Sequence, residues 1–170
     1  IYIKLKKYNF LNNIDYIYSS HNTGSAGGWN MGIEYAIKNH FDLIWLMDDD
    51  GFPHKNALLH LEKELRPTVA CAASLVLQEN KPDRFVFDMP KLNQSNLPII
   101  FSLTRKYSTI SALEVNSQGG IYKFAQLFNG ALISTDAVKN IGNINTEYFI
   151  YGDEVDFFYR LREAGDVISV

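Results

Sequence analysis

The chain has 170 residues, of which 46% are hydrophobic and 21% charged, a composition typical of one soluble globular domain. The net charge of −3 offers no basic field, so we expect no nucleic-acid partner. Its single cysteine, Cys71, excludes an internal disulfide, and no apolar run reaches the length of a membrane span. The chain begins at Ile1 without a methionine and ends in a strand-like stretch, so we expect residues 1–170 to be one domain truncated at both ends.

Residues 14–77 alternate between the patterns of strands and helices. Trp29, Ile33 and Ile37 recur at helical spacing, whereas the run before Asp48 is continuously apolar, as in a central strand covered on both faces. This alternation predicts an α/β fold with a mostly parallel central sheet flanked by helices. In chain order the predictions are a strand over 14–20, a glycine-rich loop over 21–28, a helix over 29–40, a strand over 41–47, a helix over 54–65 and a strand over 68–77.

Residues 78–120 interrupt this alternation. They hold three of the five prolines and show no helical period, so we expect loops and short strands that form a small antiparallel portion at the sheet edge. The segment is therefore interpreted as a variable insert. Regular structure is predicted again as a strand over 121–128, a strand over 129–134, a helix over 135–142 that ends at Gly142, and a helix over 152–165 followed by a strand.

Three consecutive carboxylates, Asp48, Asp49 and Asp50, follow the apolar strand directly. Like charges beside a buried strand are unfavourable unless a cation binds there. Asp48 and Asp50 have the alternate spacing with which carboxylates can hold Mg²⁺ or Mn²⁺, ions that leave positions for phosphate oxygens. The alternative is an ordinary turn whose aspartates bond the following amides, but three acids in a row favour the metal.

Two further clusters carry candidate chemistry. The loop around Gly27 and Gly28 precedes a predicted helix, where backbone amides can approach a phosphate, but a tight strand-to-helix turn needs the same glycines. Asp153, Glu154 and Asp156 open the last predicted helix. Such acids complement the helix dipole, and crowding of like charges can also raise one pKa enough for a general base. Each cluster taken alone favours the structural interpretation.

Taken together, these segments resemble family 2 glycosyltransferases with the GT-A fold. The triple aspartate is similar to that of bacterial galactofuranosyl- and rhamnosyltransferase-like members, where it replaces a simpler D-x-D motif. The resemblance covers residues 14–170 apart from 78–120, and it implies one GT-A-like catalytic domain with a Rossmann-like sheet. The segments that carry it, in the order and spacing of the family, are "NTGSAGGWNMGIEYA", "LIWLMDDDGFP", "FNGALISTDAVKNIG" and "YFIYGDEVDFFYRLREAG".

The resemblance implies roles for individual residues. Asp48 and Asp50 would form the D-x-D pair at the Mn²⁺ or Mg²⁺ ion and at the diphosphate and ribose of the donor. Asp49 would face the donor sugar or support the metal site. Glu154 would be the base that deprotonates the acceptor hydroxyl, with Asp153 as the alternative base. The other residues expected to shape the nucleotide-sugar pocket are Asn22, Gly27, Gly28, Asn30, Asn129 and Gly130.

Two departures from the family pattern concern the ends of the chain. Relatives carry an earlier strand with a T-x-N-R-like segment and a second strand whose aspartate reads the base, and neither precedes Ile1. Relatives often place a histidine ligand after the final helix, whereas the four histidines here lie at 21, 40, 54 and 60. Both departures fit truncation, under which the chain alone is expected to bind nucleotide poorly. Arg160 matches an arginine common in the final helix of the family.

The resemblance implies an inverting glycosyltransferase that moves a sugar from a nucleoside-diphosphate donor, such as UDP-galactofuranose or dTDP-rhamnose, to a saccharide or glycolipid acceptor in cell-wall or polysaccharide biosynthesis. Residues 78–120 would lie on the acceptor side. We expect a cytoplasmic protein, free or peripheral on the inner face of the membrane, with Lys4, Lys6 and Lys7 as a weak candidate contact. The alternatives are a sugar- or nucleotide-binding module, an inactive truncated transferase and a sugar-nucleotide pyrophosphorylase.

Overall fold

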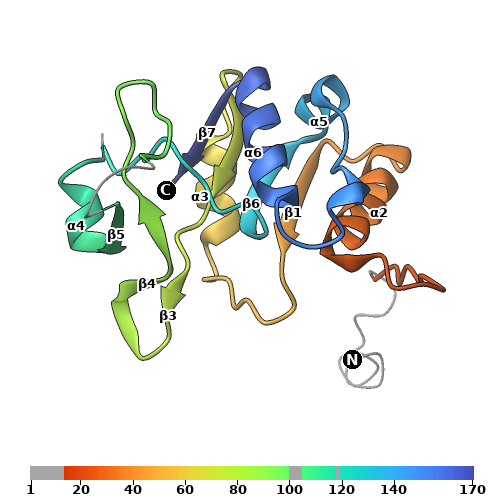
Figure 1. The fold of residues 1–170 in the computed structure, drawn as a ribbon, viewed down its shortest axis with the longest axis horizontal. Helices are drawn as coiled ribbons and strands as arrows, with labels where there is room; N and C mark the ends of the chain where they lie inside the picture. Colours follow the sequence, from red (N-terminus) through yellow and green to blue (C-terminus); the bar gives the residue numbers. More distant parts are fainter. Residues whose placement is uncertain (1–13, 100–104, 118) are drawn as a thin grey trace.

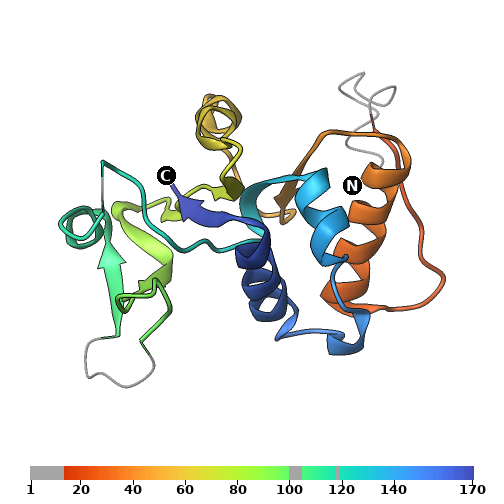
Figure 2. The same ribbon diagram turned by 90° about the horizontal axis from the view of Figure 1, so that it is seen from above.

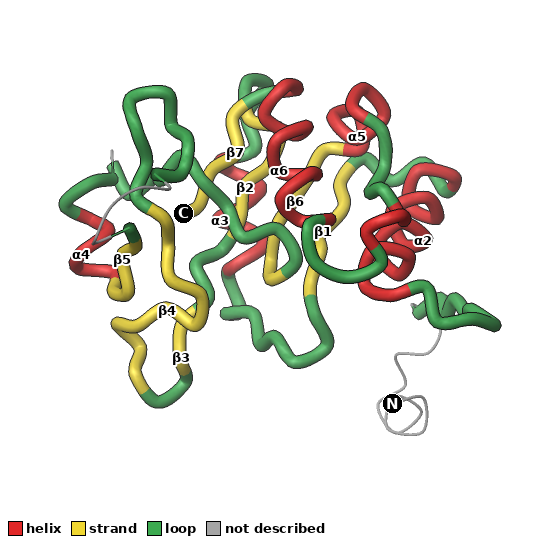
Figure 3. Tube along the Cα trace, viewed as in Figure 1, coloured by secondary structure: helices red, strands yellow, loops and turns green. Residues whose placement is uncertain are grey.

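The computed structural model describes residues 14–99, 105–117 and 119–170, and these residues form two sheets (Figure 1). The larger sheet lies between helices, and the smaller one lies to one side of it with long loops around it (Figure 3). The basic cluster over residues 4–7 lies outside the described residues.

The larger sheet has the strand order β1-β6-β2-β7. β2 pairs with β7 in parallel, whereas β6 runs antiparallel to both of its neighbours, β1 and β2. β1, β2 and β7 therefore share one direction, and the expected α/β fold is confirmed, with one reversed strand inside the sheet. The strands are β1 (Leu43–Met47), β2 (Val69–Ala73), β6 (Asn129–Ser134) and β7 (Asp166–Ser169).

Helices cover both faces of this sheet (Figure 2). The main core lies on the face covered by three helices, where Ile33, Val138 and Phe157 are almost fully buried, and Leu61 anchors the single helix on the other face. No helix in the described ranges is long and apolar enough to cross a membrane. The three helices are α2 (Gly24–Lys38), α5 (Thr135–Ile141) and α6 (Asp153–Ala164), the single helix is α3 (Ala57–Glu64), and the 3-10 helix η2 (Thr146–Tyr148) connects α5 to α6.

The segment 78–120 forms most of the smaller sheet, which has the antiparallel strand order β3-β4-β5. A separate core of Phe85, Met89, Leu113 and Tyr122 stabilises this portion. The expected small antiparallel portion is thus present, but it forms a sheet of its own instead of an edge of the larger sheet, and it contains a short helix that the sequence did not predict. Its elements are β3 (Leu77–Gln78), β4 (Lys81–Pro90), β5 (Lys106–Thr109) and α4 (Ile110–Glu114).

Two predicted strands are absent from the structure. Residues 14–20 are irregular and mostly exposed, because a strand needs a neighbour and nothing in the described part of the chain pairs with them. Residues 121–128 make only an isolated bridge, between Tyr122 and Ser169 of β7. Tyr122, Ala125, Leu127 and Phe128 of this connection are buried, so its apolar residues pack in the core without forming a strand.

The glycine-rich loop predicted over 21–28 is a third correction, because α2 begins inside it at Gly24. Gly24 has a φ of +68°, and a Cβ there would lie 2.0 Å from the carbonyl oxygen of Phe149. That oxygen accepts a hydrogen bond from the backbone N–H of Ala26 at 3.1 Å. The glycine therefore allows the first turn of α2 to contact the segment that precedes α6.

We expect Gly24→Ala to lower the free energy of unfolding by roughly 2–4 kcal/mol, because it adds left-handed backbone strain and a backbone clash. Gly32→Ala is the matched control: it lies in the same helix, and a Cβ there meets nothing within 4 Å. That change should raise stability by about 0.5–1 kcal/mol. Equilibrium urea unfolding measures both, and a Gly24→Ala variant as stable as Gly32→Ala would contradict the contact with Phe149.

Candidate active site

The triple aspartate lies at the end of β1, where it forms a turn. The backbone N–H of Gly51 donates to the Asp48 carbonyl oxygen at 3.4 Å. Asp48 is half-buried, whereas Asp49 and Asp50 are exposed. Burial raises the pKa of Asp48, as do the charges of Asp50 and Asp49, and a side-chain hydrogen bond with Asn129 opposes the rise. A backbone turn is thus present, closed by the Asp48 carbonyl oxygen and not by an aspartate side chain, and it concentrates negative charge that a cation would relieve.

β6 brings Asn129 and Gly130 beside this turn. Asn129 is the register partner of Met47, which precedes Asp48, and the side chains of Asn129 and Asp48 are hydrogen-bonded. Gly130 has a φ of +105°, and a Cβ there would approach the Ser74 side chain to 3.3 Å. Both predicted residues therefore lie at the Asp48 end of the sheet, and the backbone conformation accounts for the glycine.

Glu154, in the first turn of α6, lies at the same end of the sheet although it is far away in the sequence. Its carboxylate accepts a hydrogen bond from the backbone N–H of Leu127 at 2.7 Å. Burial raises the pKa of Glu154, and the charges of Asp153 and Asp48 add to the rise, while the Leu127 hydrogen bond opposes it. Because Glu154 and Asp48 interact electrostatically, the structure brings the two predicted carboxylate groups to one site.

Asp153 precedes Glu154 but contacts a different element. It is 3% exposed, and its carboxylate accepts a hydrogen bond from the Ser25 hydroxyl at 3.2 Å. Ser25 belongs to the first turn of α2, so this bond joins α2 to α6. The two neighbouring acids therefore have different surroundings, Asp153 in a contact between helices and Glu154 at the edge of a pocket.

A strained segment leads into α6. Tyr148, Phe149 and Ile150 form a γ-turn, in which the Ile150 N–H donates to the Tyr148 carbonyl oxygen at 2.6 Å and Phe149 has a φ of +56°. Tyr151 also has a positive φ, +66°. Non-glycine residues in such conformations cost of order 1–3 kcal/mol each and persist only where neighbours fix them. The hydrogen bond from the Ala26 N–H fixes this segment and with it the position where α6 begins.

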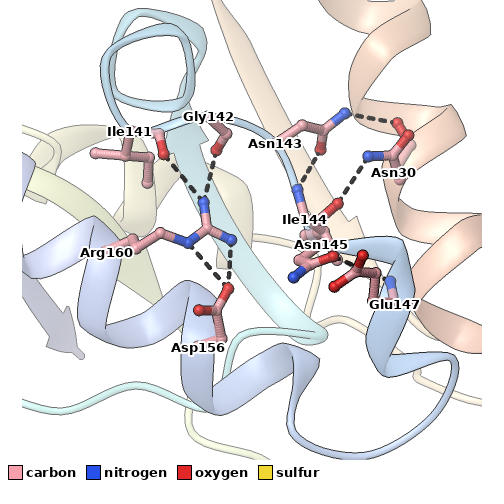
Figure 4. A network of polar contacts seen from close by, with 9 residues as sticks. All are labelled: Asn30, Ile141, Gly142, Asn143, Ile144, Asn145, Glu147, Asp156 and Arg160. Atoms are coloured by element: carbon pink, nitrogen blue, oxygen red, sulfur yellow. Dashed lines mark hydrogen bonds and ion pairs between the residues drawn. The ribbon is translucent and has the colours of Figure 1, made fainter.

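Arg160 holds α6 against α5 (Figure 4). Two of its nitrogens donate to the Asp156 carboxylate, at 2.6 and 2.9 Å. Another nitrogen donates to the carbonyl oxygens of Ile141 and Gly142 at the end of α5, where carbonyl groups have no partner within the helix. The arginine that resembles the family's final-helix arginine therefore fixes the helix that carries Glu154.

Asn30 belongs to a second network in the same region (Figure 4). The side-chain amide of Asn30 donates to the Ile144 carbonyl oxygen at 2.7 Å, and the backbone carbonyl oxygen of Asn30 accepts from the Asn143 side-chain amide at 2.9 Å. These bonds join α2 to the connection between α5 and α6. The side chain predicted for the nucleotide-sugar pocket thus takes part in a contact that stabilises the fold.

The remaining predicted donor residues lie at the start of α2. The side-chain oxygen of Asn22 accepts from the Gly24 N–H at 3.0 Å. Gly27 is buried, and a Cβ there would lie 2.3 Å from the Thr23 Cβ, whereas Gly28 is exposed to open space. None of the hydrogen bonds formed within residues 14–99, 105–117 and 119–170 joins these residues to the triple-aspartate turn.

A pocket of about 340 Å³ opens beside Glu154, between α6 and the smaller sheet. This volume is at the low end of the range for small-molecule sites, about 300–1,000 Å³. Most of the lining is apolar, and the polar side chains are Asp88, Lys106, Gln126, Glu154 and Tyr159, the last through its hydroxyl. Of these side chains only Glu154 belongs to a recognisable motif, because Asp88 and Lys106 lie in the segment 78–120, where no motif marks them.

The donor set at the aspartate turn fits a divalent cation. Mg²⁺ and Mn²⁺ take oxygen ligands and are commonly held by one or two carboxylates together with water and phosphate oxygens. In the part of the chain that the structure describes, no three or more histidine, cysteine, aspartate or glutamate side chains form a group that could hold a metal ion. Asp48 and Asp50 would therefore hold an ion together with ligands that the protein does not supply.

Comparison with known proteins identifies relatives of this chain. The family model for glycosyl transferase family 2 matches residues 3–125. The chain is 32% identical over 151 residues to the galactofuranosyltransferase GlfT1 of Mycolicibacterium smegmatis, and 31% identical over 153 residues to the protein of the same name from Mycobacterium tuberculosis. The matches cover 88% of this chain but 48% and 47% of the relatives, so the chain spans about half of their length.

A solved structure has the same fold. The crystal structure of GalNAc-T7 with UDP, GalNAc and Mn²⁺ matches with a TM-score of 0.66 at 15% sequence identity, over 98% of this chain and 33% of that one. This match confirms the GT-A fold that the sequence predicts. Because the family model covers more than half of the chain and the sequence relatives exceed 30% identity, the chain belongs to glycosyl transferase family 2.

Proposed function

We propose that this chain is the catalytic part of an inverting glycosyltransferase that moves a sugar from a nucleoside-diphosphate sugar to a saccharide or glycolipid acceptor. One observation carries the proposal: Glu154, whose pKa is raised, interacts with Asp48 and lines a pocket. Direct transfer needs a base and a donor-binding group close together. Since the sequence relatives are named galactofuranosyltransferases, we propose UDP-galactofuranose as the donor, with dTDP-rhamnose as the alternative.

On the donor side, Asp48 and Asp50 would hold Mn²⁺ or Mg²⁺. A bound divalent ion supplies charge stabilisation for a departing diphosphate. The raised pKa of Asp48 supports this assignment, because burial and the neighbouring charges of Asp50 and Asp49 both disfavour its ionised form, which a bound cation would stabilise. The residues proposed to border the sugar nucleotide are Asp49, Asn129 and Gly130 beside the turn, and Asn22, Gly27, Gly28 and Asn30 on and before α2.

On the acceptor side, Glu154 would take the proton of the attacking hydroxyl. As that O–H bond breaks, the oxygen forms a bond to the anomeric carbon of the donor sugar. The bond from this carbon to the diphosphate oxygen breaks, its electron pair leaves with the nucleoside diphosphate, and the anomeric configuration inverts. The raised pKa of Glu154 supports its role, because a general base works best when its pKa is close to the pH of the reaction. Asp153 is proposed to position α6.

The segment 78–120 is proposed to form the acceptor side. It contributes the smaller sheet, which makes one wall of the pocket beside Glu154. An acceptor hydroxyl must reach Glu154, and this pocket gives access to it. We place the reaction in the cytoplasm, by a free or membrane-peripheral enzyme of cell-wall or polysaccharide synthesis, and the free buried thiol of Cys71 fits a reducing compartment.

The test is turnover of donors by the full-length protein that contains this chain. We expect it to release UDP from UDP-galactofuranose in the presence of Mn²⁺, faster with a glycoside acceptor and much more slowly with EDTA. UDP-galactopyranose and dTDP-rhamnose are the comparison donors, and NMR of the product gives its anomeric configuration. No nucleotide release from any of the three donors would reject the transferase, and retained configuration would reject a single displacement.

A further inference from the structure

The pocket beside Glu154 lies between α6 and the smaller sheet, and each side contributes a different kind of group. α6 contributes Glu154 together with two aromatic rings, Phe158 and Tyr159. The smaller sheet contributes two side chains of opposite charge, Asp88 from β4 and Lys106 from β5. A ligand in this space would therefore meet the proposed base on one side and a pair of charges on the other.

The strand register explains why Asp88 and Lys106 share a face. Pro90 is the register partner of Lys106, and Asp88 is two residues from Pro90, so all three lie on the same face of the sheet. The intervening pair, Met89 and Tyr107, faces the opposite side, where both pack in the core of the smaller sheet. The pairing of β4 with β5 thus places Lys106 beside Pro90, and Asp88, next to the register shift between Arg84 and Met89, lines the same pocket.

Neither charge contributes to the ion pairs of the fold. Among the residues that the structure describes, Asp88 and Lys106 form no ion pair with each other or with another side chain. Asp88 is half-buried and Lys106 is exposed. Because neither group is in an ion pair with a described residue, the Asp88 carboxylate can accept hydrogen bonds from a ligand in the pocket, and the Lys106 ammonium can donate up to three.

The wall that carries these charges is fastened to the helix that carries the base. Arg162, about two turns after Glu154 on α6, donates to the carbonyl oxygens of Ser95 and Asn96 at 2.9 and 2.6 Å. Ser95 and Asn96 belong to the turn between β4 and β5. These bonds join the connection between β4 and β5 to α6, the helix that carries Glu154.

We infer that Asp88 and Lys106 determine which acceptor is used, and that this acceptor presents a neutral sugar ring. The inference rests on the proposed function. Asp88 would accept hydrogen bonds from hydroxyl groups of the sugar ring, and Lys106 would donate to oxygens of the same ring. The C–H face of the sugar ring would pack on Phe158 and Tyr159. The lining holds two carboxyl groups, Asp88 and Glu154, against the single ammonium of Lys106, and this balance disfavours a phosphate or carboxylate but not an uncharged ring.

The test compares Asp88→Asn and Lys106→Met with Lys81→Met in the full-length protein. Lys81 is exposed at the start of β4 and does not line the pocket. UDP-galactofuranose is the donor, and octyl glycosides of neutral hexoses and 6-deoxyhexoses are the acceptors. We expect the KM for the best acceptor to rise roughly tenfold or more in both pocket variants, because hydrogen bonds to charged groups are strong, while the KM for the donor changes much less. Lys81→Met should match the wild type.

Monodeoxy analogues of the best acceptor separate recognition from a change in the shape of the pocket. For the analogue that lacks the hydroxyl bound by Lys106, the wild type and Lys106→Met should have the same KM, because the contact is absent from both complexes. A general distortion would instead raise the KM of the variant for every analogue, and that result would overturn the inference.

The other outcomes are equally distinct. Acceptor KM values equal to those of the wild type in both pocket variants, with UDP release intact, would overturn the role of Asp88 and Lys106. A wild-type protein that hydrolyses the donor but transfers to none of the glycosides would overturn the class of acceptor. Failure of the wild type to release UDP at all would reject the proposed function instead.

Discussion

Replacing Glu154 by glutamine is expected to lower the transfer rate by about 10²–10⁴-fold, the range that a positioned general base contributes. Glutamine has nearly the same shape and can still accept the hydrogen bond from the Leu127 N–H, but it has no carboxylate to take a proton. Binding of the donor should therefore remain close to that of the wild type. Steady-state kinetics gives the loss in kcat, and calorimetric titration with UDP and Mn²⁺ gives the affinity for the nucleotide.

The same substitution should change stability in a defined direction with pH. The pKa of Glu154 is raised above its ordinary value of 4.5 by burial and by the charges of Asp153 and Asp48. Its contribution to stability is therefore fully present below about pH 4.5 and is lost as the pH rises through the higher pKa of the folded state. A glutamine side chain does not ionise and suffers no such loss, so the free energy of unfolding of Glu154→Gln relative to the wild type should increase toward neutral pH. Urea unfolding in EDTA at several pH values measures this difference.

Asp153→Asn is the matched control for the transfer rate of Glu154→Gln. Asparagine can still accept the hydrogen bond from the Ser25 hydroxyl, so the contact between α2 and α6 is retained. We expect the transfer rate of Asp153→Asn to stay within about tenfold of the wild type, since the loss of a general base exceeds that range. If Asp153→Asn instead abolished transfer while Glu154→Gln did not, the assigned roles would be reversed.

The best sequence predictions concern elements with strong local signals. α5 begins where the Ser134 side chain accepts from the Asp136 N–H, and it ends at Gly142 with a φ of +84°. α6 begins with acids in its first turn and ends at Gly165, as its sequence pattern predicts. β1 is recognisable from its apolar run. Because the aspartates and Glu154 lie at ends of such elements, the main features of the candidate site could be predicted as well.

The wrong predictions concern residues whose structure depends on distant contacts. Gly24, Gly27 and Gly28 have low helix propensity, so a loop was expected, yet α2 is stabilised by burial of Ala26 and Ile33 and by contact with the segment before α6. The antiparallel direction of β6 also depends on distant contacts, those with β1 and β2. A short apolar strand has no sequence period that distinguishes parallel from antiparallel pairing, and its direction is set by the sheet that it joins.

The pocket was inaccessible to sequence analysis for a related reason. Asp88 and Lys106 lie on the paired strands β4 and β5, and Glu154 lies on α6, which Arg162 joins to the connection between those strands. No residue in this set has a characteristic spacing from another along the chain. Sites formed by pairing register and by side-chain bonds to backbone carbonyls need the folded structure to be recognised.

Asp48→Asn is expected to abolish stabilisation of the protein by Mn²⁺. A ligand that binds only the folded state at about 100 times its Kd adds about 2.7 kcal/mol of stability. For a domain of 150–250 residues each kcal/mol corresponds to roughly 2–4 °C in Tm, so Mn²⁺ added with UDP to the full-length wild type should raise the Tm of the unfolding transition of this domain by several degrees beyond UDP alone. Asparagine has the same shape as aspartate and can keep a hydrogen bond with Asn129, but it lacks the charge that attracts the ion.

Asp42→Asn provides the matched control, since Asp42 precedes the opposite end of β1 and its side chain is exposed. This variant should keep the full Mn²⁺-dependent rise in Tm, and its transfer rate should equal that of the wild type. Asp48→Asn should also reduce transfer by roughly 10²-fold or more, because charge stabilisation by a metal is worth several kcal/mol.

If Asp48→Asn kept the Mn²⁺-dependent rise in Tm, the aspartate turn would not be a metal site. If it lost the rise but kept the transfer rate, the ion would stabilise the fold without assisting the departure of the diphosphate. Loss of both in Asp48→Asn, beside an unchanged Asp42→Asn, is the result that a donor-binding metal requires.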